Sequence, residues 1–170
     1  MSSGWWIFIP DPDVERAQLI YDEAMGYGRI GLSFAHYMGD LTQLRYDNEM
    51  IARKFDDKTG STSDNVTNSF VRMFRNLLDG ISIGDLALYP STKVDGMLNV
   101  GRITSAYKYS QHASFAHFRD VKWLAKYPRE TFSTAILKKY PRALAVSPIK
   151  DENEFLCALV ERLSADGILK

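Results

Sequence analysis

The sequence predicts one α+β domain, spanning residues 1–170 and built on a small curved sheet. The chain has 170 residues, of which 45% are hydrophobic and 25% are charged. This size and composition suit one globular domain with one core. Apolar residues recur at helical spacing in the first half of the chain, whereas strand-like runs follow one another from residue 83 to residue 124. Consecutive strands joined by short loops are typical of an antiparallel meander.

The first predicted element is a buried strand at residues 5–9, which are apolar and aromatic and are followed by a Pro-Asp-Pro turn. Asp11 is expected to cap the next helix, with Pro12 at its first position. Helical spacing of apolar residues continues to Gly26, where we expect this helix to end. The segments expected next are a short strand at 29–32, a loop or broken helix at 33–44, a helix at 46–55, a polar surface loop at 56–65 and a strongly amphipathic helix at 66–78.

The second half of the chain is predicted to hold most of the sheet. Residue types alternate at 106–109 and at 118–123, as expected for strands with two different faces. Asp151 and Glu154 resemble a capping box at the start of the last helix. The predicted elements are strands at 83–89, 97–109 and 115–124, a weak helix at 129–140, a strand at 143–146 and a helix from 151 to 163.

Composition predicts a cytoplasmic protein without membrane contact. The first residues lack the basic and apolar regions of a signal peptide. The longest apolar runs are too short to span a bilayer. The one cysteine, Cys157, lies in an apolar helical pattern with Phe155 and Leu159, so we expect a buried and unreactive thiol.

Charge is balanced over the whole chain but unevenly distributed along it. The formal net charge is zero, yet segment 11–57 holds ten acidic and five basic residues, and segment 101–142 holds nine basic and two acidic residues. A neutral total argues against indiscriminate coating of nucleic acid, whereas a basic half permits a directed contact with a polyanion. The alternative interpretation is that these charges are solvated strand faces and chain ends.

No catalytic, metal or cofactor motif is recognisable in the sequence. The histidines His36, His112 and His117 have no metal-ligand spacing with another histidine, a cysteine or an acid. Nucleotide-binding and nucleophile motifs are absent. Asp85 follows a glycine at a strand start, but the second carboxylate and lysine of a two-metal nuclease do not follow it. We therefore predict a protein that is not an enzyme, with no catalytic residue, no metal and no cofactor.

Aromatic residues gather at predicted strand ends and loops. Tyr107 and Tyr109 are two residues apart and share a strand face, with Lys108 on the opposite face. A pair of aromatic side chains near basic residues can stack a nucleobase or cage an apolar group. The alternative for each aromatic residue is packing in the core.

Several short runs, in order, resemble a known family. They are ISIGDLALYP at 81–90, VGRITSAYKY at 100–109 and HFRDVKWL at 117–124, with Ile30-Gly31, Gly39-Asp40-Leu41 and Thr131-Phe132-Ser133 as further matches. This pattern resembles the N-terminal domain of Mrr-type restriction-system proteins, which is similar to the PUA-like group that includes the EVE and YTH domains. The resemblance covers most of residues 5–148. Leu32 stands where that family has a tryptophan, and Phe8 where it has an arginine.

The resemblance implies a PUA-like curved antiparallel or mixed β-barrel flanked by helices. It also implies a pocket that accepts a flipped, modified base between aromatic side chains. The expected partner is nucleic acid, with DNA preferred, in a restriction or antiviral-defence system. Any cutting would then be performed by a separate effector protein.

Two sets of site residues follow from the resemblance and the aromatic pattern. The predicted base-binding pocket consists of Trp6, Ser33, Phe34, Asp40, Tyr107, Tyr109 and Trp123. The predicted phosphate-binding residues are Arg102, Lys108, Arg119 and Lys122. Strand alternation gives only one of Trp5 and Trp6 to such a pocket, and the sequence does not decide which.

Two other functions are compatible with the sequence. The same scaffold could serve as a protein-interaction or small-nucleotide-binding module, with the apolar face of the last helix as a partner surface. A stand-alone enzyme is the third hypothesis, and it requires a nucleophile or metal set that the sequence does not display.

Overall fold

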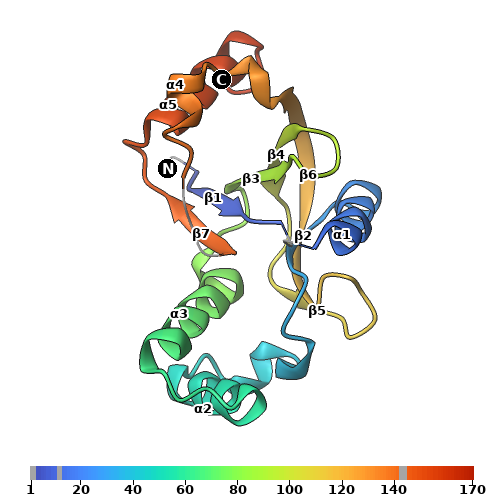
Figure 1. Ribbon diagram of the computed structural model, residues 1–170, viewed down its shortest axis with the longest axis vertical. Coiled ribbons are helices and arrows are strands. Elements are labelled where there is room, and N and C mark those ends of the chain that lie inside the picture. Colours follow the sequence, from blue (N-terminus) through green and yellow to red (C-terminus); the bar gives the residue numbers. More distant parts are fainter. Residues whose placement is uncertain (1–2, 11–12, 142–144) are drawn as a thin grey trace.

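The computed structural model describes residues 3–10, 13–141 and 145–170, which form a curled, mixed sheet with helices on both sides (Figure 1). The strand order is β2-β6-β4-β3-β1-β7, and β5 pairs with β6. The strands are β1 (Trp5–Phe8), β2 (Arg29–Leu32), β3 (Leu86–Ser91), β4 (Met97–Ile103), β5 (Lys108–Tyr109), β6 (His117–Pro128) and β7 (Val146–Ile149). The predicted α+β class and curved mixed sheet are confirmed at this level, as a half-barrel flanked by helices.

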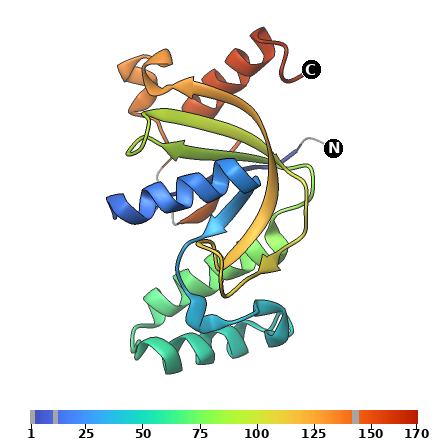
Figure 2. The ribbon, with the colours of Figure 1, turned by 90° about the vertical axis from the view of Figure 1, so that its right-hand side faces the viewer.

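Antiparallel pairing of β3 with β4 and of β4 with β6 forms the predicted meander. The parallel pairing of β1 with β3 makes the sheet mixed, and β7 lies antiparallel to β1. The strand expected at 97–109 is two strands, because the chain leaves the sheet after β4 and returns as the short β5. Figure 2 shows the long β6 curving from the region of β5 toward the end of the molecule where α4 lies.

Helices cover both faces and one end of the sheet. The α-helices are α1 (Val14–Tyr27), α2 (Asn48–Thr59), α3 (Asp64–Arg75), α4 (Thr134–Leu137) and α5 (Glu154–Ala165). Shorter helical turns are the 3-10 segments η1 (His36–Met38), η2 (Leu41–Leu44) and η4 (Arg129–Thr131), and the π-helical turn η3 (Asn76–Gly80). Figure 2 shows α1 crossing the sheet, with α2 and α3 at one end of the molecule and α4 and α5 at the other.

The first and last residues of α1 differ from those predicted. The helix runs through Gly26 and ends at Gly28, whose φ of 61° is the left-handed conformation that glycine adopts at helix ends. At the start, the Asp13 side chain caps the helix by accepting from the Arg16 backbone N–H. The expected cap residues Asp11 and Pro12 lie outside the described residues.

Later boundaries also shift from those expected. The polar loop predicted at 56–65 is largely helical, because α2 continues to Thr59 and α3 begins at Asp64. The helix expected at 129–140 is only η4 and the four-residue α4. The last helix is capped by Asn153, whose side chain accepts from the Leu156 N–H, instead of by the predicted capping box.

Two hydrophobic cores lie on opposite faces of the sheet. Trp6 packs in the core that faces α1, α2 and α3, whereas Trp5 packs in the core that faces α4 and α5. Both tryptophans are buried, with exposed fractions of 9% and 7%. Each face of β1 is covered, so the two indoles lie in different cores, and Trp5 contributes to the lining of a hollow on the α5 face.

The apolar face of α5 belongs to the second core, where Phe155 and Leu159 are fully buried. It is therefore not a free partner surface. Cys157 lies beside this apolar stripe and is exposed, so the prediction of a buried thiol is wrong. Within the described chain, no helix combines the length and apolar character needed to cross a bilayer.

Candidate functional site

The strand β2 ends the sheet and leaves one of its edges open. Among the strands of the described residues it pairs with β6 alone, with Gly31 opposite Phe118. The Val121 N–H donates to the Gly28 carbonyl at 2.8 Å, so Gly28 is a residue whose backbone groups face β6. In an antiparallel pair every second residue faces the partner strand in this way. Gly31 is three residues after Gly28, so its N–H and C=O point away from β6.

Glycine is also the only residue type that fits at position 31 of β2. A Cβ atom there would lie 2.0 Å from the His117 carbonyl oxygen and 2.7 Å from the Phe118 Cα. Both are backbone atoms of the paired strand, so no side-chain rotation relieves the overlap. The chain therefore presents a bare peptide group at the open edge.

A cavity of about 150 Å³ lies against this edge. Its lining comes from the end of β1, the end of β2 and the segment before β7: Ile9, Pro10, Gly31, Leu32, Ser33, Phe34 and Ala145. The Ile9 N–H donates to the Ala145 carbonyl at 2.9 Å, which joins the two segments opposite β2. We call this cavity the edge hollow.

Phe34 separates the edge hollow from a second cavity of about 150 Å³ against α3. The lining of this helix hollow is Phe34, Ser69, Phe70, Met73 and Ala145. The Phe34 ring meets the Phe70 ring edge to face, at 6.0 Å between centroids and 83° between planes. The Phe34–Phe70 pair thus lies beside the edge hollow and the helix hollow.

A third cavity, of about 160 Å³, lies on the α1 side of the same turn. Ser33, Arg16, His36 and Ser114 contribute to its lining. The Arg16 Nη2 donates to the Ser33 carbonyl at 2.7 Å, so a guanidinium group lies beside the turn. The Ser33–Phe34 turn is therefore in contact with all three cavities.

A buried histidine holds the segment that follows this turn. The His117 Nε2 lies 2.9 Å from the Ala35 carbonyl, and its Nδ1 lies 2.7 Å from the Tyr107 hydroxyl. A carbonyl only accepts, so Nε2 carries the proton and Nδ1 accepts from Tyr107. The hydroxyl in turn accepts from the Leu41 N–H at 3.2 Å. This network joins β6 to both ends of the 35–41 segment.

Strained backbone occurs in the same connection between β2 and α2. Ala35, Arg45 and Tyr46 have positive φ values of 66°, 53° and 59°. Residues with a Cβ rarely adopt this conformation, and such strain gathers at functional sites. The His117 hydrogen bond to Ala35 maintains the first of these positions.

The stability of the fold is expected to fall in acid because of His117. Burial lowers the pKa of His117 to about 4, from an ordinary value near 6.5. Its neutral form therefore stabilises the folded state fully above pH 6.5, and this contribution is lost as the pH falls through 4. The shift corresponds to about 3 kcal/mol. Urea unfolding at pH 7, 5.5 and 4.5 measures the loss.

Comparison with two variants isolates the His117 contribution from that of the carboxylates. His117→Gln is expected to be less stable than the native protein at pH 7 but to lose less stability on acidification. His112→Gln, which alters an exposed histidine, is the matched control and keeps the native pH dependence. Equal pH dependence in all three proteins would contradict this assignment.

The predicted base-pocket residues separate into different environments. Ser33 and Phe34 line the cavities described above. Tyr107 and Tyr109 pack on His117, with ring centroids 6.0 and 5.4 Å from the imidazole. These two tyrosines support the 35–41 segment and do not line the edge hollow.

The remaining three candidates have structural roles. Asp40 caps η2 by accepting from the Thr42 N–H at 3.0 Å. The Trp6 indole N–H donates to Asp85 at 2.9 Å, and the Trp123 indole N–H donates to a carbonyl of α1 at 2.9 Å. Both tryptophans belong to the core around α1, so a single aromatic pocket of all seven residues does not form.

The predicted phosphate-binding set is divided as well. Arg119 is 3% exposed and donates to the carbonyls of Leu77, Leu78 and Ser105 at 2.8, 3.0 and 3.1 Å. We therefore remove it from the phosphate-binding set. Lys108 pairs with Asp120 at the surface.

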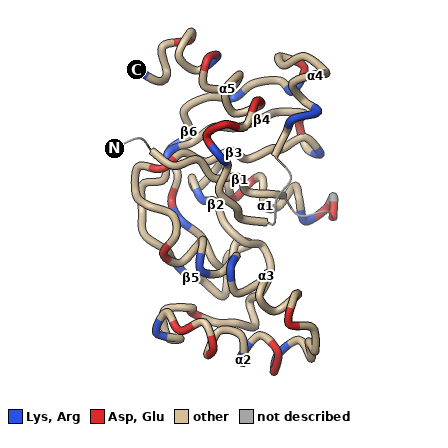
Figure 3. The backbone as a smooth tube through the Cα atoms, turned by 90° about the vertical axis from the view of Figure 1, so that its left-hand side faces the viewer, with Lys and Arg blue, Asp and Glu red and all other residues tan. Residues whose placement is uncertain are grey.

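Arg102 and Lys122 are cross-strand neighbours on β4 and β6. The Arg102 Nη1 donates to the Gly84 carbonyl at 2.9 Å, and its side chain lines a hollow beside Trp5, on the α5 face of the sheet. The edge hollow lies near the other core. Figure 3 shows Lys and Arg positions spread over the molecule from β5 to α4 instead of gathered in one place.

Sequence reasoning missed the open edge at Gly31 and the buried His117. A glycine inside a short apolar strand is a signal of close backbone approach, and it was available at 29–32. No group of three or more His, Cys, Asp or Glu side chains suited to a metal ion is present within residues 3–10, 13–141 and 145–170.

The fold and cavities define an α+β half-barrel with an open sheet edge beside an aromatic wall. Residues 7–147 match the family described as a domain of unknown function (DUF8426). This match covers most of the chain, so the protein belongs to that family. No curated protein and no solved structure matches the chain.

Proposed function

We propose that this chain is a nucleic-acid-sensing module that binds DNA and takes an unstacked base, including a modified base, into the edge hollow. One observation carries this proposal. The free peptide edge of Gly31 and the ring of Phe34 line the same cavity of about 150 Å³. The module reads its ligand and performs no chemistry on it.

The two walls of the edge hollow suit the two properties of a nucleobase. A peptide N–H and C=O side by side offer one donor and one acceptor, which complement the donor and acceptor groups on a base edge. Phe34, Ile9 and Pro10 offer an apolar surface to the ring. Unstacking a base costs a few kcal/mol, and stacking on an aromatic side chain recovers about 1–3 kcal/mol.

The proposed setting follows from the resemblance to Mrr-type proteins. It is a restriction or defence system in which a separate effector protein acts after the base is recognised. The arginines predicted for phosphate binding do not line the edge hollow. This favours a second candidate, a small-nucleotide-binding module on the same scaffold.

Fluorescence anisotropy with labelled oligonucleotides tests the proposal. The probes are matched duplex and single-stranded DNA with one 5-methylcytosine, one N6-methyladenine or no modification. We expect one modified probe to bind more tightly than the plain probe, and Phe34→Ala to weaken its binding by about tenfold or more, because a stacking surface is lost. Tyr37→Ala removes an exposed aromatic ring outside the cavities and is the control.

Three results separate the possibilities. Equal weak binding to all probes that depends only on salt, unchanged in Phe34→Ala, contradicts the base-reading proposal. A mononucleotide that binds as tightly as the oligonucleotide supports the small-nucleotide module. Weakening by Phe34→Ala but not by Tyr37→Ala supports a base in the edge hollow.

A further inference from the structure

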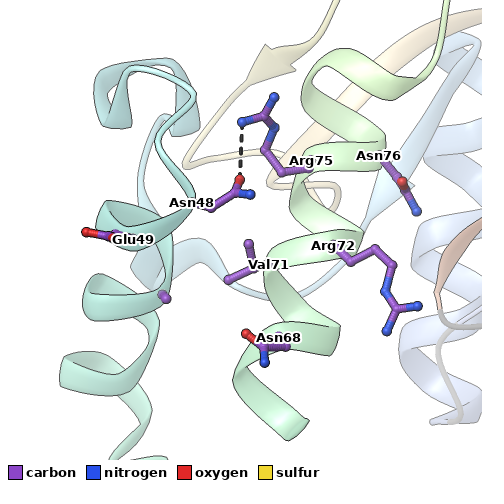
Figure 4. Close-up of a pocket in the computed structure, with 8 residues that line it drawn as sticks. Asn48, Glu49, Asn68, Val71, Arg72, Arg75 and Asn76 are labelled. Carbon is purple, nitrogen blue, oxygen red and sulfur yellow. Dashed lines mark hydrogen bonds between the residues drawn. The ribbon is translucent and has the colours of Figure 1, made fainter. Parts of the chain in front are cut away.

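The largest cavity beside the α3 helix is a groove between α2 and α3, with a volume of about 420 Å³ (Figure 4). It is lined by carboxamides, two arginines, a carboxylate and two small apolar residues: Asn48, Asn68, Asn76, Arg72, Arg75, Glu49, Ala52 and Val71. No residue of this groove lines the edge hollow or the helix hollow. These side chains suit a ligand that carries hydrogen-bonding groups.

Arg75 forms a fixed part of the groove wall. Its guanidinium group pairs with Asp79 and donates to the Asn48 side chain at 3.2 Å and to the Tyr46 carbonyl. The dashed line in Figure 4 marks the contact with Asn48, which joins α3 to α2. The charge of Arg75 is compensated by Asp79, so this residue orders the groove instead of supplying a free cation.

Arg72, unlike Arg75, is neither held in place by hydrogen bonds nor compensated by a carboxylate within the described residues. It is exposed, and within the described chain no hydrogen bond or ion pair engages its guanidinium group. Figure 4 shows its side chain directed away from α2 and from Arg75. Arg72 is thus an exposed cation at the rim of the groove, available to an anion.

The position of Arg72 on α3 connects the groove to the aromatic cavities. Residues three or four apart are neighbours on a helix surface. Arg72 therefore lies next to Asn68 and Asn76 of the groove, and also next to Ser69, which lines the helix hollow beside Phe34. Arg72 thus lies on α3 between residues of the groove and a residue of the helix hollow.

We propose that the α2–α3 groove binds the sugar–phosphate backbone of the DNA strand whose base enters the edge hollow, and that Arg72 binds a phosphate next to that base. This inference rests on the proposed function. The Asn48 and Asn68 carboxamides supply donors for phosphate and sugar oxygens, and Val71 offers an apolar contact to the sugar. The Glu49 carboxylate on the α2 wall repels phosphate, which confines it to the α3 side.

Salt-dependent binding measures this contact. With a single-stranded DNA probe, Arg72→Ala is expected to lower affinity about tenfold at low salt and to reduce the slope of log K against log salt concentration by about one. Arg72→Lys keeps the charge and is expected to keep the slope. Arg53→Ala removes the same charge from an exposed position of α2 outside the groove and is expected to change neither quantity.

Free deoxynucleosides distinguish the groove from the edge hollow, because they lack phosphate. Arg72→Ala is expected to bind them as the native protein does. Equal effects of Arg72→Ala and Arg53→Ala on DNA would overturn the inference, as would an unchanged salt slope in Arg72→Ala. A reduced slope in Arg72→Ala, combined with native DNA affinity in Phe34→Ala, would support the groove and contradict the base in the edge hollow.

Discussion

Gly31→Ala is expected to lower the free energy of unfolding by at least about 3 kcal/mol. The new Cβ would lie 2.0 Å from the His117 carbonyl oxygen, and both atoms belong to the paired backbones of β2 and β6. The overlap is relieved only if the two strands separate, which also disturbs the His117 network. Chemical denaturation monitored by tryptophan fluorescence measures the loss.

Gly26→Ala is the matched control for this substitution. Gly26 lies in α1 with no heavy atom within 4 Å of an added Cβ. Gly26 is the second-last residue of α1, where alanine is favoured over glycine by less than in a helix interior, so a gain of up to about 0.5 kcal/mol is expected. Comparable stabilities of Gly31→Ala and the native protein would show that β2 and β6 do not approach as closely as described.

Replacing Arg119 by methionine is expected to cost about 3 kcal/mol or more, because two buried carbonyl oxygens and one partly buried carbonyl oxygen lose their donor. The Leu77 and Leu78 carbonyls belong to the π-helical turn η3, in which the Ile81 N–H donates to the Asn76 carbonyl instead. Burial lowers the pKa of Arg119, whereas Asp85 and Asp79 raise it. The Arg119 guanidinium group thus supplies hydrogen-bond donors to two carbonyl groups of this helical segment.

Two further variants test the role of the guanidinium group. Arg119→Lys keeps the charge but loses the planar fork that reaches several carbonyls, so most of the loss is expected to persist. Lys122→Met alters an exposed residue of the same strand and is expected to change stability by less than about 0.5 kcal/mol. Native stability in Arg119→Met, measured by thermal unfolding, would contradict the structural role.

The fold was most predictable where contacts are local. Apolar residues at helical spacing indicated α3, and alternation at 118–123 indicated β6, because those patterns depend on neighbours in the chain. The parallel pairing of β1 with β3 joins residues about eighty positions apart and leaves no local signal. The end of α1 was misplaced because Gly26 and Gly28 are equally good candidates until the backbone conformation is known.

The candidate site was predictable only in part. Ser33 and Phe34 were identified from an aromatic loop position and from the family resemblance, and both line the edge hollow. Arg119 was assigned to phosphate as one of the basic residues of segment 101–142, but charged residues on strands can also be buried when they are paired. The π-helical turn that supplies its carbonyl partners has no periodic signature, and Arg72 was hidden in a helix whose apolar face alone was considered.

The central claim is that a base occupies the cavity at the open edge of β2. The most direct measurement is an NMR titration of the isotope-labelled protein with the deoxynucleosides of 5-methylcytosine and N6-methyladenine. We expect the amide signals of Gly31 and Ser33 and the ring signals of Phe34 to shift together, with one affinity. Saturable binding that leaves these signals unmoved while signals around Arg102 shift would contradict it.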